Sequence, residues 1–357
     1  MDQSTRQPKL LKDYAPPNYL VDTVDLDFAL DPKATRVKSK LRLRPNPKAD
    51  AAGRPLALDG EGLVLQSLAL DGKPLGLDDY RLDEKSLTIL SVPGRPFTVE
   101  TVTLCDPEAN TALSGLYRSR GTYCTQCEPE GFRRITFFLD RPDVLAIYTV
   151  RVEADAETAP VLLSNGNPVS AGKVPGTAKH FAIWHDPHPK PSYLFALVGG
   201  NLAQVPSRFT TASGRDVALN IYVEAGKEDR CGWAMQSLKR AMRWDEERFG
   251  REYDLDVFNI VAVSDFNMGA MENKGLNIFN DKLVLARPDT ASDADYGAIE
   301  GVIAHEYFHN WTGDRVTCRD WFQLCLKEGL TVFRDQEFSA DQRSRTVKRI
   351  ADVRTLR

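Results

Sequence analysis

The sequence predicts an all-β N-terminal domain, built as a curved sheet or sandwich, followed by an α+β domain. Three observations support this fold class. Apolar and polar residues alternate with a period of two after Asn18, turn sequences separate the alternating stretches, and helical spacing of apolar residues begins only after Gly199-Gly200. We therefore expect two domains, residues 1–201 and 202–357, with a break near the two glycines.

The N-terminal domain is expected to consist of strands. Val24, Leu26 and Phe28 alternate with polar residues, and the stretch 37–43 repeats this pattern. A period of two is typical of strands that are half buried in an antiparallel sheet. Turn sequences such as Asp71-Gly72-Lys73-Pro74 separate the stretches. Further strands are expected at 86–91, 97–104, 135–138, 146–152 and 193–198.

The C-terminal domain is expected to combine strands with helices. Strands are predicted at 215–223 and 255–263. Between them Leu238 and Met242 recur at helical spacing, and Gly250 is a natural helix stop. Further helices are expected at 298–311, 320–340 and 345–357. No Gly or Pro stop follows the last helix, so we expect the chain to be the front part of a longer protein.

Composition and charge argue against several classes of function. The chain has 357 residues, of which 42% are hydrophobic and 27% charged, as in an ordinary soluble globular protein. The formal net charge is -4 and no block of like charge appears, so we expect no nucleic-acid partner. No stretch of about 20 apolar residues occurs, so we expect no membrane span. The polar residues 1–6 and only six cysteines predict a cytoplasmic, reduced protein without a signal peptide.

The segment His305-Glu306-Tyr307-Phe308-His309 has the pattern H-E-x-x-H. On a helix, residues four apart share a face, so both imidazoles can bind one metal ion. Glu306 is placed to reach a water molecule at the metal without binding the metal itself. Two histidines on a helix are more often packed side chains than ligands, so a third ligand has to decide between these readings.

Glu328 is the candidate for that third ligand. Catalytic zinc sites commonly combine two histidines with one carboxylate and leave the fourth position to water. A turn at 311–314 would fold the helix 320–340 back over the first helix and bring Glu328 to the histidines; otherwise Glu328 is a solvated helix carboxylate. Asp335, two turns further on, could hydrogen-bond the far nitrogen of a zinc histidine. A surface position is nevertheless the simpler expectation for Asp335.

Three stretches in the right order carry a resemblance to a known family. The zinc pattern is preceded by Gly269-Ala270-Met271-Glu272-Asn273 and, earlier, by C-T-Q-C-E-P-E-G-F-R at 124–133. Together they resemble the zinc aminopeptidases of the aminopeptidase N family, and most closely its bacterial branch, from about Tyr19 to Arg357. The resemblance implies a thermolysin-like zinc catalytic domain, one zinc ion per chain, and broad-specificity hydrolysis of the N-terminal amino acid from peptides, of the alanyl aminopeptidase type.

The resemblance also implies how the free N-terminus of a peptide is bound. Glu272 and Glu128 would hold the α-ammonium group, since a cation is best held by carboxylates. Gln126 and Met268 would shape the pocket for the first side chain, and the backbone of Gly269-Ala270 would run along the substrate. The full set of implied substrate-binding residues is Gln126, Glu128, Met268, Gly269, Ala270, Met271, Glu272 and Asn273. Without the zinc pattern, Glu272 would be an ordinary turn carboxylate.

The implied mechanism uses His305, His309 and Glu328 as zinc ligands and Glu306 as general base. The family also places a tyrosine about sixty residues beyond the third ligand to stabilise the oxyanion. That position falls past Arg357, so the chain is expected to lack this tyrosine and the later, C-terminal domains that close the site. Two alternatives stay open: a truncated, catalytically impaired fragment that binds zinc or peptide, and a bifunctional enzyme that resembles leukotriene hydrolases. The amino-acid sequence at 124–133 favours the bacterial aminopeptidase branch over the enzyme that resembles leukotriene hydrolases.

Other patterns are discounted. Cys124-x-x-Cys127 lacks the second cysteine pair of a zinc ribbon and the βαβ surroundings of a redox motif. His185-Asp186-Pro187-His188 could bind a metal ion, but its proline predicts a rigid polar loop instead. The spacing of Met235 and Met242 predicts core packing.

Overall fold

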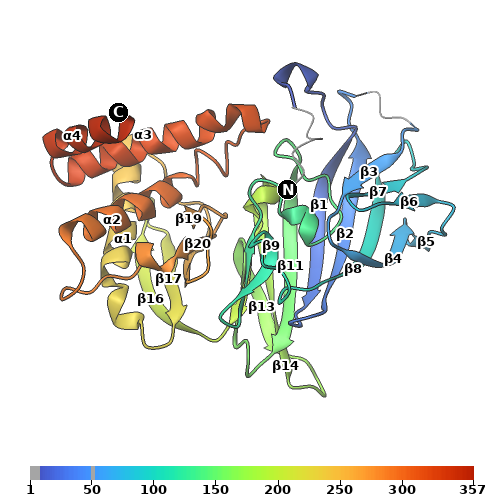
Figure 1. Cartoon of the computed structure of the whole chain (residues 1–357), viewed down its shortest axis with the longest axis horizontal. Helices are drawn as coiled ribbons and strands as arrows, with labels where there is room; N and C mark the ends of the chain where they lie inside the picture. The colour runs from blue at the N-terminus through green and yellow to red at the C-terminus, as the bar shows by residue number, and fades with distance from the viewer. Residues whose placement is uncertain (1–8, 50–52) are drawn as a thin grey trace.

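The structure is a computed structural model that describes residues 9–49 and 53–357 (Figure 1). The polar segment 1–6, from which the absence of a signal peptide was predicted, lies outside the described residues. Figure 1 shows strands from the first part of the chain on one side of the molecule and the helices of the second part on the other. None of the described helices has the length and hydropathy needed to cross a bilayer.

The largest sheet of the N-terminal part has eight strands in the order β13-β14-β11-β1-β2-β8-β4-β5. β1 and β11 are parallel, and the other neighbours are antiparallel. Along β2, buried and exposed side chains alternate, as the sequence pattern predicts. The bounds are β1 (Tyr19–Ala29), β2 (Thr35–Pro45), β4 (Val64–Leu70), β5 (Lys73–Pro74), β8 (Phe97–Cys105), β11 (Leu145–Asp155), β13 (Asn167–Lys173) and β14 (Lys179–Pro191).

Two smaller sheets complete this part. A three-stranded sheet contains β3 (Leu56–Asp59), β7 (Ser86–Ile89) and β6 (Tyr80–Leu82). A four-stranded sheet contains β12 (Val161–Ser164), β15 (Leu197–Gly200), β10 (Thr122–Gln126) and β9 (Gly115–Ser119). Short 3-10 turns are η1 (Leu11–Asp13), η2 (Phe132–Arg134), η3 (Ser192–Leu194), η4 (Glu228–Arg230), η5 (Asp281–Leu283) and η6 (Trp321–Gln323).

The second part of the chain packs helices against a five-stranded sheet in the order β16-β17-β18-β20-β19. Its strands are β16 (Leu202–Thr210), β17 (Asp216–Glu224), β18 (Val257–Val263), β19 (Ala270–Met271) and β20 (Leu276–Asn280). Its helices are α1 (Gly232–Phe249), α2 (Asp293–Phe308), α3 (Leu324–Gln342) and α4 (Arg345–Leu356). α1 ends where Gly250 takes φ 63°, and Met235 and Met242 are buried in the core as predicted.

The predicted fold class, an all-β part followed by an α+β part, is confirmed, but three local predictions are wrong. Residues 135–138 form no strand; they follow η2, and only Phe138 makes an isolated bridge to Asp59. The predicted strand 193–198 begins only at Leu197, because η3 occupies the residues before it. The prediction of a rigid loop at 185–188 is also wrong, since these residues lie within β14.

The pair Gly199-Gly200 lies in a strand close to the predicted boundary between residues 1–201 and 202–357. Both glycines are buried in β15, between β12 and β10, and a Cβ on Gly200 would lie 2.7 Å from the Thr122 hydroxyl oxygen. The chain leaves this sheet at Gly200 and enters the five-stranded sheet at Leu202. A buried cluster that includes Tyr193 from the first part and Met271 from the second joins the two parts.

Candidate metal and substrate site

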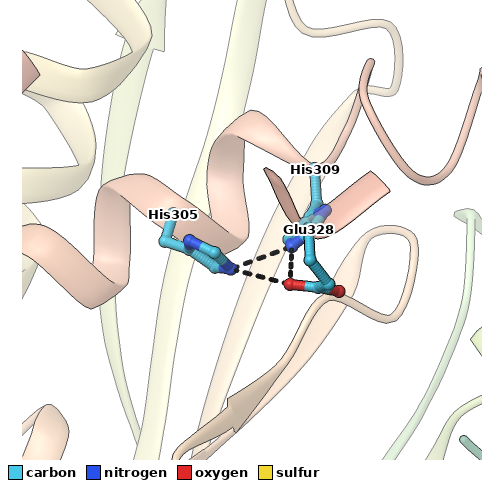
Figure 2. A group of neighbouring side chains, drawn as sticks. All are labelled: His305, His309 and Glu328. Carbon is cyan, nitrogen blue, oxygen red and sulfur yellow. Dashed lines mark hydrogen bonds and ion pairs between the residues drawn. The ribbon is translucent and has the colours of Figure 1, made fainter. Parts of the chain in front are cut away.

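Three predicted ligands converge at the end of α2 (Figure 2). His305 lies in the last turn of α2 and His309 caps it, and their Nε2 atoms are 3.0 Å apart. The turn after His309 reverses the chain, and α3 packs back on α2. Glu328, from the beginning of α3, places its Oε2 3.4 Å from each Nε2.

The hydrogen bonds on the far side of each ring show that this site suits a cation. His305 Nδ1 lies 2.7 Å from Oδ2 of Asp335, and His309 Nδ1 lies 2.9 Å from the carbonyl oxygen of Thr312. A carboxylate and a carbonyl only accept, so each Nδ1 carries a proton. Both Nε2 atoms then face Oε2 of Glu328. Two imidazole nitrogens and one carboxylate oxygen are the donor set of a catalytic zinc site.

Electrostatics favour positive charge at this point. Burial alone would lower the pKa of His305, but hydrogen bonds to Asp335 and Glu328 raise it to about 10. Burial alone would raise the pKa of Glu328, but hydrogen bonds from both histidines hold it well below its ordinary value. A metal ion entering the site must therefore displace a proton from His305.

Glu306 lies beside the three ligands and lines the same cavity, whose volume is 760 Å³. Its side chain is buried, and burial raises its pKa to about 8, with the negative charges of Glu272 and Glu328 acting in the same direction. A carboxyl group with a pKa near neutrality can accept a proton and return it, as a general base that later acts as an acid must do.

The two carboxylates implied to hold a substrate ammonium also meet here. Glu128 follows β10 and Glu272 follows β19, and both line the cavity. Burial and the neighbouring charge of Glu272 raise the pKa of Glu128 to about 7. Burial would also raise the pKa of Glu272, but the Lys327 ammonium outweighs it and lowers that pKa. Lys327 is a residue that the sequence analysis missed, because a lysine preceding a helical glutamate carries no signal of its own.

The other implied substrate-binding residues divide into two groups. Met268, Gly269 and Ala270 line the cavity, and Met268 is 47% exposed. Ala270 lies in β19, the edge strand of the five-stranded sheet. Three further residues, Gln126, Met271 and Asn273, are buried outside the cavity lining. Gln126 donates from Nε2 to the Glu128 carbonyl at 3.2 Å and contacts the Met271 sulfur at 3.7 Å.

The discounted patterns form no second site in the described part of the chain. Cys124 and Cys127 are buried free thiols, and burial raises the pKa of each. His185 Nδ1 lies 3.1 Å from the Thr149 hydroxyl, and His188 pairs with Asp254 rather than with a second histidine. Among the described residues, each group of carboxylate, imidazole and thiol atoms close enough to share an ion belongs to the cavity above.

Comparison with known proteins matches both parts of the chain to domains of one peptidase family. Residues 18–194 match the description "Peptidase M1 N-terminal domain", and residues 233–355 match "Peptidase family M1 domain". Aminopeptidase N of Caulobacter vibrioides is 57% identical over 357 residues, which cover 100% of this chain and 41% of that protein. Aminopeptidase N of Escherichia coli K12 is 56% identical over 355 residues, or 99% of this chain and 40% of that protein.

A solved structure shows the same fold. It is aminopeptidase A of Legionella pneumophila in complex with aspartic acid, with a TM-score of 0.90 and 41% sequence identity. The match covers 93% of this chain and 39% of the Legionella chain. The chain thus spans about two fifths of the length of the curated relatives described above, which share 41% and 40% of their length with it.

Proposed function

The chain belongs to peptidase family M1, and from this premise we propose that it binds one zinc ion and hydrolyses the N-terminal amino acid from peptides. The resemblance to bacterial aminopeptidase N is confirmed by identities of 55–57%. The observation that carries the proposal is the convergence in one cavity of a two-histidine, one-carboxylate donor set, a buried glutamate and two further carboxylates.

The proposed metal centre uses His305, His309 and Glu328. Zinc held there would supply Lewis acidity, which polarises a peptide carbonyl and acidifies water. Glu306 takes the proton of the attacking water and delivers it to the leaving amine, and its raised pKa of about 8 supports both halves of this role. Asp335 fixes the ring of His305 so that Nε2 faces the metal.

The proposed choice of the N-terminal residue depends on Glu128 and Glu272. Each carboxylate has one oxygen, Oε2, that accepts no hydrogen bond from any described residue. A charge-assisted hydrogen bond from a substrate α-ammonium to each would contribute about 1.5–3 kcal/mol. Since the two carboxylates come from the two parts of the chain, the substrate end would lie at their junction. A cytoplasmic location remains part of the proposal, and the free state of all six cysteines supports it.

The test combines metal content with turnover. We expect one zinc ion per chain by atomic absorption, and none in His309→Ala. Glu306→Gln should retain the zinc ion but lower hydrolysis of alanine 4-nitroanilide by a factor of about 10²–10⁴. N-acetylation of the substrate should abolish its cleavage. A zinc-loaded parent that cleaves neither substrate would instead support the alternative of a chain that binds zinc without turnover, and unchanged zinc content in His309→Ala would refute the metal site.

A further inference from the structure

Lys327 contacts three carboxylates at once. Its Nζ lies 2.8 Å from Oε1 of Glu128 and 2.7 Å from Oε1 of Glu328, and it also contacts Oε1 of Glu272. These partners come from three separate segments: the loop after β10, the loop after β19, and α3. The Lys327 side chain has 0% exposed surface, so its ammonium lies inside the cluster and not at its rim.

The two carboxylate oxygens of Glu328 contact different partners. Oε1 forms an ion pair with Lys327 Nζ at 2.7 Å, whereas Oε2 faces both histidine Nε2 atoms at 3.4 Å. An unrestrained carboxylate can offer both oxygens to a metal ion. Here one oxygen is held by an ammonium group and only the other points at the two imidazoles.

Packing keeps the Lys327 side chain in this place. A Cβ built on Gly313 would lie 3.3 Å from Lys327 Cγ, so the backbone of the turn closes over the aliphatic stem. The Tyr193 ring lies on another side, with its centroid 5.1 Å from Nζ. The ammonium cannot swing into solvent unless the turn or α3 moves.

We propose that Lys327 is a positioning residue that limits Glu328 to one-oxygen binding of the metal ion and ties Glu128 and Glu272 to the metal centre. By occupying Oε1, the ammonium keeps a coordination position open for water or substrate, as a catalytic zinc site requires. The same ammonium contacts one oxygen of Glu128 and one of Glu272 and leaves the other oxygen of each for a ligand. This inference rests on the proposed zinc site.

The experiment compares the parent with Lys327→Met after both are loaded with Co²⁺, because zinc itself has a filled d shell and no visible spectrum. Methionine keeps most of the stem but offers no proton, so Oε1 of Glu328 becomes free to bind the metal. Five-coordinate cobalt absorbs more weakly in the visible than four-coordinate cobalt. We therefore expect a loss of visible intensity in Lys327→Met, and a gain of one light-atom neighbour in X-ray absorption at the zinc edge of the zinc-loaded variant.

Lys190→Met is the matched control. Lys190 is equally buried and pairs with Asp186 at 3.1 Å, but it lies in β14 and does not line the cavity. Its cobalt spectrum should match that of the parent. If Lys327→Met does not fold, the double variant Lys327→Met/Glu272→Gln removes one cation and one anion together, and it should show the same loss of intensity.

The outcomes separate this inference from the proposed function. A parent that binds one Co²⁺ ion, with a spectrum that stays the same in Lys327→Met or in the double variant, would overturn the role of Lys327 and leave the metal site intact. A loss of intensity in Lys190→Met as well would also overturn it, because any buried lysine would then have the effect. A parent that binds no stoichiometric Co²⁺ would refute the proposed metal centre and this inference together.

Discussion

Asp335 holds His305 through a contact of 2.7 Å between its Oδ2 and the ring Nδ1. Asp335 lies on α3 two turns after Glu328, so both carboxylates project from the same face of that helix toward α2. The sequence alone favoured a surface position for Asp335, whereas its side chain is only 18% exposed. One helix thus supplies both a ligand candidate and the group that orients a second ligand candidate.

Asp335→Asn should weaken zinc binding about 10- to 100-fold. A neutral amide orients the imidazole of His305 less firmly than a carboxylate does, and it raises the basicity of the ring less. Competition with a chelator of known affinity measures this directly. Glu337→Gln, which changes a carboxylate on the same helix that pairs with Arg345, is the control and should keep the parent affinity. Equal affinities in all three proteins would show that Asp335 does not support the site.

The parts of the fold that follow from local patterns were predictable. The alternation in β1 and β2 reflects one buried face, and Gly250 ends α1 because it adopts the left-handed conformation there. The donor set His305 and His309 also follows from a local rule, since a helix brings residues four apart to one face.

What depends on distant partners was not predictable. Residues 185–188 look like a loop because of Pro187, yet they form a strand, since β14 pairs with both β11 and β13. Lys327 reveals its role only when Glu128, 199 positions earlier in the chain, lies against it. Neither pairing leaves a periodic or compositional trace in the sequence near the residue concerned.

Glu272→Gln or Glu128→Gln should lower kcat/KM for a free dipeptide amide about 10- to 100-fold while zinc stays bound. The loss corresponds to one charge-assisted hydrogen bond of about 1.5–3 kcal/mol to the α-ammonium. Glu130→Gln is the matched control and should behave as the parent, because Glu130 lies in the same segment as Glu128 but pairs with Lys9 and Arg133 and does not line the cavity. If the parent cleaves the N-acetylated amide as fast as the free one, the two carboxylates do not select the N-terminus.

Gly313→Ala should disturb the site in two ways, because Gly313 has φ 156°, which strains any L side chain, and because its Cβ position is crowded. The added Cβ would lie 2.7 Å from His309 Nδ1, closer than packed atoms tolerate, so the imidazole must move away from its position. We expect weaker zinc binding and a destabilisation of about 1–3 kcal/mol, typical of overpacking. Gly94→Ala, where nothing lies within 4 Å of the new carbon, controls for the change of residue type. Parent-like zinc affinity and melting temperature in Gly313→Ala would contradict the close approach.

Asp314 is a buried carboxyl group whose Oδ1 has no hydrogen-bond partner among the described residues. Complete burial raises its pKa well above the ordinary 3.8, and the positive charge of Lys274 offsets this only in part. The folded chain therefore holds this proton more tightly than the unfolded chain does. The resulting stability is fully present below the unfolded pKa and is lost as the pH rises through the folded pKa.

Asp314→Asn should remove this pH dependence, because the amide resembles the protonated acid in shape and never ionises. We expect the free energy of unfolding of the parent to fall relative to that of Asp314→Asn as the pH rises from about 5 to 8, by about 1.4 kcal/mol for each unit of pKa shift that lies in this range. Denaturant unfolding of both proteins across this pH range measures the difference. Asp78→Asn, at an exposed position, should run parallel to the parent. If the parent instead gains stability over Asp314→Asn with rising pH, then the carboxyl group is ionised and paired in the folded chain, and the attraction of the nearby lysines outweighs the cost of its burial.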